Sequence, residues 1–160
     1  MSPPTPAPIQ PGPSAPPTCA MQALQAVVLA MPMARTLGLH FVHAERGSVE
    51  IEIPVSDAFC HRPGELQATA VFAAADFAAV AAAGSTLPPG WINATVDTSL
   101  KLVAPARGSC LRARGRVVHA ARLLTVCAAD VFAVDAAGAE TLCATLLATA
   151  RNIEVAPAKA

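Results

Sequence analysis

The chain has 160 residues, which is enough for one domain with a core and too few for two ordinary domains. Its 11 basic and 11 acidic residues give a formal net charge of zero, which argues against a nucleic-acid-binding surface. The five cysteines lie far apart without a Cys-x-x-Cys pair, a pattern that favours neither a disulfide framework nor a zinc knuckle. We therefore expect a cytoplasmic protein with reduced thiols, no cofactor and no bound metal.

Residues 1–18 are rich in proline and contain neither lysine nor arginine. They lack the apolar run of an export signal, and they hold too little apolar surface to fold. The longest apolar run elsewhere, residues 23–33, is interrupted by Gln25 and Pro32 and is too short to span a bilayer. The sequence therefore predicts a disordered tail over residues 1–18, either inert or partner-docking, and one folded domain over residues 19–155.

The folded domain is predicted to begin with a helix that has Thr18 as its N-cap. Apolar residues from Leu24 to Met31 recur at helical spacing and define one face. Pro32 is expected to end or kink this helix, and Gly38 is expected to close the connection to the first strand.

Two strands are predicted next, over residues 39–46 and 48–55. In the second strand, apolar residues alternate with Ser, Glu and Pro, as in a strand with one buried face. We interpret residues 56–66 as a loop with its turn at residues 62–64, where an Arg-Pro-Gly sequence occurs.

Residues 67–83 consist almost entirely of Ala, Val and Phe, without Gly or Pro. Alanine is the best helix former, so this segment is predicted to be a helix, and its apolar character all round predicts that it is buried. Asp76 is the only charged residue within it.

Four further strands are predicted over residues 91–104, 109–119, 122–134 and 139–151. The short turns between them predict antiparallel meander pairing. The expected fold class is therefore α+β, with an antiparallel sheet of about five or six strands wrapped around one long buried helix.

Four segments give this pattern a more specific interpretation. Residues 31–38 contain P-x-x-x-x-L-G before the first strand. Residues 61–76 follow the spacing N-x-x-G-x-x-H-(A/G)-G-x₆-(D/E). Residues 100–106 are similar to the end of a strand in the same family of proteins, and residues 135–138 to its last hairpin. In order and spacing, over residues 22–152, the chain resembles the hotdog-fold acyl-CoA thioesterases of the phenylacetate-pathway and YiiD C-terminal type. The resemblance implies the hotdog fold, hydrolysis of an acyl-CoA thioester to free acid and CoA, and a homodimer or homotetramer.

The resemblance also implies the candidate catalytic residues. Asp76 would act as base or nucleophile, which suits a lone carboxylate whose pKa is raised by apolar surroundings. Gln67, Ala68 and Thr69 lie at the helix start, where the Ala68 N–H would stabilise charge on the carbonyl oxygen and Thr69 would contact substrate. His61 would position substrate or water from the loop. The alternative interpretation of Asp76 is a structural residue on an exposed stripe.

Three positions depart from the family pattern. Gln67 replaces the usual histidine, His61 replaces an asparagine, and Val80 stands where many relatives have Ser or Thr one turn after the acidic residue. The changes at Gln67 and Val80 favour the alternative function, a hotdog module that binds acyl-CoA without hydrolysing it.

Basic residues on one predicted strand offer a site for the phosphates of CoA. Arg112, Arg114 and Arg116 share one face, with Lys101 and Arg107 expected nearby. The alternative interpretation is a solvated strand face. No aromatic residues interleave with the arginines, so nucleic acid is not an expected partner.

Overall fold

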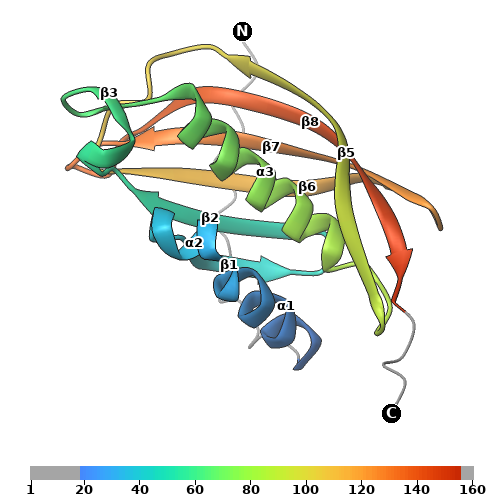
Figure 1. Cartoon of the computed structure of the whole chain (residues 1–160). Helices are drawn as coiled ribbons and strands as arrows, with labels where there is room; N and C mark the ends of the chain where they lie inside the picture. The colour runs from blue at the N-terminus through green and yellow to red at the C-terminus, as the bar shows by residue number, and fades with distance from the viewer. Residues whose placement is uncertain (1–18, 156–160) are drawn as a thin grey trace, which may run out of the picture.

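The computed structural model describes residues 19–155, in which a six-stranded antiparallel sheet curves around one long helix (Figure 1). The strand order is β1-β2-β6-β7-β8-β5. The strands are β1 (His40–Glu45), β2 (Ser48–Pro54), β5 (Trp91–Leu102), β6 (Cys110–Ala120), β7 (Leu124–Val134) and β8 (Glu140–Glu154). The α+β hotdog architecture predicted from the sequence is confirmed.

The central helix α3 (Ala68–Gly84) packs against the concave side of the sheet. Nine of its residues are buried, and all of them except Val71 are alanine. Gly115 of β6 lies directly beneath the helix, because a methyl group added there would come within 2.0 Å of the Ala78 carbonyl oxygen. Small residues on both surfaces therefore allow the helix and sheet backbones to approach closely.

Two short helices lead into the sheet. Helix α1 (Cys19–Ala30) ends before Pro32, which begins α2 (Pro32–Leu37). Gly38 adopts a left-handed φ of 67° and donates its N–H to the carbonyls of Ala34 and Arg35. The predicted break at Pro32 and closure at Gly38 are confirmed. Thr18 and the predicted tail, residues 1–18, lie outside the described residues.

The segment predicted as a loop over residues 56–66 has more structure than expected. It contains a 3-10 turn (Asp57–Phe59) and a small hairpin formed by β3 (Cys60–Arg62) and β4 (Glu65–Leu66). The turn over residues 62–64 is confirmed, with Gly64 at a φ of 70°. Strands this short carry too few residues to show a period-2 pattern, so sequence alternation does not detect them.

The prediction of a four-strand meander is wrong for β5. Strands β6, β7 and β8 pair in sequence order, but β5 pairs with β8 at the far edge of the sheet. The edge of β6 that β5 would use is already taken by β2. Residues 103–109 therefore cross the end of the sheet, where Val103 N–H bonds to Cys143 O and Ser109 N–H to Val134 O.

Strand β5 is consequently an edge strand in the single chain. Three of its apolar residues, Ile92, Val96 and Leu102, are 54%, 56% and 53% exposed. An open edge with exposed apolar side chains is a surface for pairing with another strand.

We predict that Gly115→Ala destabilises the protein strongly. Its new methyl group would overlap the main chain of α3 at Ala78, which cannot move aside without displacing the helix. The expected loss in the free energy of unfolding is about 3 kcal/mol, measured by urea denaturation. Gly84→Ala is the matched control, because its methyl group would meet only the flexible side chains of Leu24 and Asn93. Equal effects of the two substitutions would contradict the close-packing account.

Candidate functional site

Asp76 lies in the middle of α3, on the side of the helix that faces β5. Its Oδ1 accepts a hydrogen bond of 3.0 Å from the Thr95 hydroxyl. Burial raises the pKa of Asp76 above its ordinary value, and the weaker effect of the Thr95 hydrogen bond lowers it. The raised pKa expected from the sequence is confirmed, and Asp76 is half-buried rather than on an exposed stripe.

The titratable group that faces Asp76 from the sheet is the thiol of Cys127 on β7. Burial, together with the negative charge of Asp76, raises the pKa of Cys127 to about 11. The thiol is therefore protonated at neutral pH, and the carboxylate is the group at this position that can take up a proton.

Thr95 is the site residue that the sequence analysis missed. Asn93 and Thr95 of β5 both form hydrogen bonds to α3. Asn93 Nδ2 donates a hydrogen bond of 2.9 Å to the Val80 carbonyl, one helical turn beyond Asp76. Thr95 therefore supplies a hydroxyl to Asp76 from β5, whereas Val80, at the position where many relatives have Ser or Thr, has none. Polar residues alternate along β5, and the helix before it carries a single charged residue, Asp76. Together these two sequence features could have indicated a polar partner for Asp76 on β5.

The start of α3 presents two free backbone donors. Gln67 is the N-cap, with extended φ and ψ of −65° and 150°, and its side chain forms no capping hydrogen bond. The N–H groups of Ala68 and Thr69 donate to no protein acceptor within residues 19–155. Together with the positive end of the helix dipole, they can stabilise negative charge on a carbonyl oxygen.

The donors at the helix start and the Asp76 carboxylate are separated along the helix. Asp76 follows Ala68 by eight positions, which places them about 12 Å apart along the axis. One thioester carbonyl cannot contact both groups of the same chain.

His61 lies on the hairpin before α3 and not beside Asp76. Its Nε2 is 3.3 Å from Glu65 Oε1 and accepts a hydrogen bond of 3.0 Å from Arg62 Nε. Glu65 is only 6% exposed and accepts a 2.6 Å hydrogen bond from Arg107 Nε, which lowers the pKa of Glu65. The cluster ties His61 and Arg107 to the hairpin that leads into the helix.

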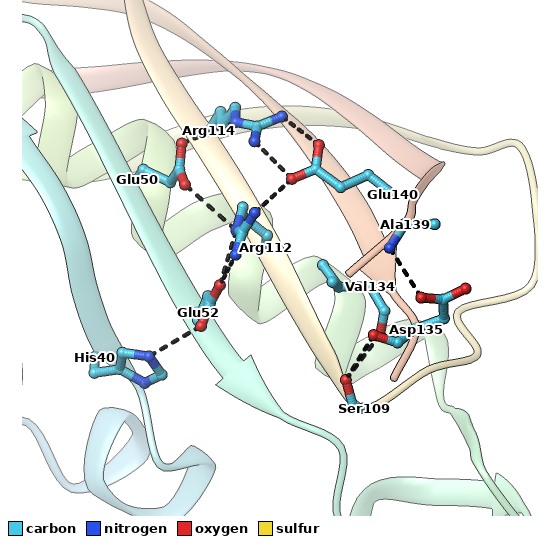
Figure 2. Close-up of polar contacts among 10 residues, drawn as sticks. All are labelled: His40, Glu50, Glu52, Ser109, Arg112, Arg114, Val134, Asp135, Ala139 and Glu140. Carbon is cyan, nitrogen blue, oxygen red and sulfur yellow. Dashed lines mark hydrogen bonds and ion pairs between the residues drawn. The ribbon is translucent and has the colours of Figure 1, made fainter. Parts of the chain in front are cut away.

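Arg112 and Arg114 share one face of the sheet as predicted, but their assignment to the phosphates of CoA needs correction. Arg112 and Arg114 lie on the face of the sheet opposite α3, where Glu50, Glu52 and Glu140 surround them (Figure 2). The Arg114 guanidinium donates to Glu140 over 2.7 and 2.8 Å and to Glu50 over 2.8 Å.

The remaining basic residues do not extend this cluster. Arg116 pairs with Asp130 at 3.0 Å, whereas Lys101 lies on β5 and donates to the Ser99 hydroxyl. Because Arg112 and Arg114 are already bonded to carboxylates, they are not available as a phosphate site. The sequence shows alternation along one strand, but it does not show which carboxylates lie on the strands beside it.

Two further properties concern residues 19–155 alone. None of the helices in this part of the chain is long and apolar enough to cross a membrane. No three His, Cys, Asp or Glu side chains within the same residues are grouped as a metal site requires.

The fold is similar to those of several solved thioesterase structures. A thioesterase family protein from Silicibacter pomeroyi has a TM-score of 0.81 and 29% identity, with 84% of this chain and 98% of that chain covered. A phenylacetic acid degradation-related protein from Ralstonia eutropha JMP134 has a TM-score of 0.69 and 25% identity, over 80% and 98% of the two chains. The PaaI protein of E. coli has a TM-score of 0.73 and 17% identity, over 86% and 96%.

No family profile and no curated protein sequence matches the chain. The structural similarities nevertheless confirm the resemblance to the hotdog thioesterase superfamily that the sequence motifs indicated. They support thioester hydrolysis in general.

We predict that Thr95→Val raises the pKa of Asp76 further. The substitution removes the hydrogen bond that favours the ionised carboxylate, while burial continues to disfavour it. A pH titration of the Asp76 carboxyl carbon by NMR measures this shift. Thr95→Ser keeps the hydroxyl and is the rescue variant, and Thr149→Val on β8 is the control. An unchanged pKa in Thr95→Val would show that the hydrogen bond is not formed in solution.

Proposed function

We propose that this protein hydrolyses an acyl-CoA thioester to the free acid and CoA, with Asp76 as the catalytic carboxylate. The observation that carries the proposal is the half-buried Asp76 carboxylate, bonded to Thr95 and held on an otherwise apolar helix. The similarity of the fold to thioesterases gives the reaction class. We place this reaction in the cytoplasm.

The proposed reaction begins with a water molecule between the substrate and Asp76. The water oxygen attacks the thioester carbon while Asp76 accepts the water proton, and the Thr95 hydroxyl holds the carboxylate in place. Negative charge develops on the carbonyl oxygen, where the Ala68 N–H stabilises it. The C–S bond then breaks, and the CoA sulfur leaves with the proton that Asp76 held. Direct attack by the carboxylate, followed by hydrolysis of the anhydride, uses the same groups.

We further propose that the active site forms between two copies of the chain. The Ala68 N–H and Asp76 of one chain lie about 12 Å apart along α3, so a second copy must supply one of them to each substrate. The open edge of β5, with exposed Ile92 and Val96, offers the surface on which two sheets can join. The proposed assembly is a homodimer, alone or paired into a homotetramer.

The phosphates of CoA are assigned to Lys101 and Arg107 in this proposal. Lys101 has no carboxylate partner within residues 19–155, and the Arg107 side chain is 62% exposed beyond its bond to Glu65. His61, in the hairpin before α3, and Thr69, in the first turn of α3, would contact the substrate near its thioester.

Gln67 favours a second candidate function. An amide cannot transfer a proton as the histidine of the family pattern can, and the Gln67 side chain forms no capping hydrogen bond. A protein that binds acyl-CoA without turnover would tolerate this change.

Asp76→Asn distinguishes the two candidates. If Asp76 is the catalytic carboxylate, turnover of acyl-CoA should fall by about 100-fold or more, measured as release of free CoA thiol. Binding of a non-hydrolysable acyl-CoA analogue should persist, because the proposed phosphate contacts at Lys101 and Arg107 are unchanged. The variant should also gain stability at neutral pH, since the raised pKa means that the ionised carboxylate destabilises the fold.

The control is Asp57→Asn, which removes an exposed carboxylate of the 3-10 turn. It should leave turnover unchanged. Retained turnover in Asp76→Asn would contradict the catalytic role, whereas binding of the analogue without any wild-type turnover would establish the binding module.

A further inference from the structure

A cavity of about 300 Å³ lies at the C-terminal end of α3, remote from the helix start. One wall is the connection after the helix, with Thr86 and Pro88. The other wall is the turn between β6 and β7, which includes Arg122, and Trp91 of β5 lies between them. This volume is at the lower end of the range for ligand pockets, so the cavity suits a small ligand.

Two of the residues that line the cavity have buried polar side chains that satisfy each other. Thr125 is 0% and Asn152 is 5% exposed, and their side chains are hydrogen-bonded across β7 and β8. Asn152 Nδ2 also donates 2.9 Å to the Ala121 carbonyl, which holds the β6–β7 turn against β8. The wall that carries Arg122 is therefore fixed by buried hydrogen bonds.

Arg122 differs from the arginines on the opposite face of the sheet. Arg112, Arg114 and Arg116 are all paired with carboxylates, but the Arg122 side chain has no ion-pair or hydrogen-bond partner within residues 19–155. An unpaired guanidinium at an apolar cavity is complementary to a carboxylate, which it can bind through two parallel hydrogen bonds.

Trp91 supplies the apolar half of the recognition. It is the only tryptophan of the chain and is half-buried in the cavity wall next to Pro88. An indole ring offers a flat surface against which another aromatic ring packs. We propose that this cavity binds a small aromatic carboxylate, with its ring against Trp91 and its carboxylate on Arg122.

This binding site is separate from the Asp76 site. The cavity shares no residue with Asp76, Thr95 or the start of α3. Thr86 follows Asp76 by ten residues, which corresponds to about 15 Å along a helix. The proposal therefore goes beyond the proposed hydrolysis and does not rest on it.

The single tryptophan makes the proposal directly testable by fluorescence. Benzoate should change the Trp91 emission of the full chain in a saturable way. Benzamide, its neutral isostere, should bind at least about tenfold more weakly. Arg122→Gln should raise the Kd for benzoate by about tenfold or more. Arg151→Gln, on the opposite face of β8 beside Asn152, is the matched control and should leave the Kd unchanged.

The proposal would be overturned if benzoate caused no saturable change in Trp91 emission, if benzoate and benzamide bound equally well, or if Arg122→Gln left the Kd for benzoate unchanged. Emission that depends on protein concentration and not on benzoate would show that a second copy covers the cavity.

Discussion

The close approach of α3 to the sheet at Ala78 and Gly115 fixes how the helix, and Asp76 with it, lies against the sheet. A methyl group added at Gly115 would overlap the main chain of Ala78, so position 115 has no room for a side chain. With the alanine face buried against the sheet, the side of the helix that carries Asp76 turns toward β5. The same packing gives the carboxylate its apolar surroundings and brings it to hydrogen-bonding distance of Thr95. The position and the raised pKa of Asp76 thus follow from a helix built of small residues.

The two faces of the sheet differ in how their polar groups are paired. On the face opposite α3, the carboxylates of Glu50, Glu52 and Glu140 neutralise Arg112 and Arg114 (Figure 2). The centroid of the Phe132 ring lies 4.8 Å from the Arg114 guanidinium. Such a network is internally satisfied and leaves few donors for a ligand. On the face with α3, the polar groups are few and each has a specific position. The proposed chemistry therefore belongs to the helix side and to the edge strand β5.

Much of the fold could be predicted from the sequence, because its elements are encoded locally. The alanine-rich segment favours a buried helix, Pro32 fixes its own φ, and Gly38 permits the left-handed φ that ends α2. The partner of β5 could not be predicted, because alternation identifies a strand but not its neighbour. The same limit explains why Thr95 was missed and why Arg112 and Arg114 were assigned to phosphate. Asp76 and the helix start were found because a lone charge in an apolar helix and the family spacing are both visible in the sequence.

The central claim, that two copies combine to form each active site, is tested most directly by mixing two inactive variants. Ala68→Pro removes the backbone donor at the first helical position, where proline is tolerated, and Gln67 already has the extended conformation that precedes a proline. Each variant alone should be inactive. If Asp76 and the Ala68 N–H of each site come from different chains, co-expression of Asp76→Asn with Ala68→Pro should restore about a quarter of the wild-type turnover, since half of the dimers then hold one intact site. No recovery in verified mixed dimers would contradict the shared site.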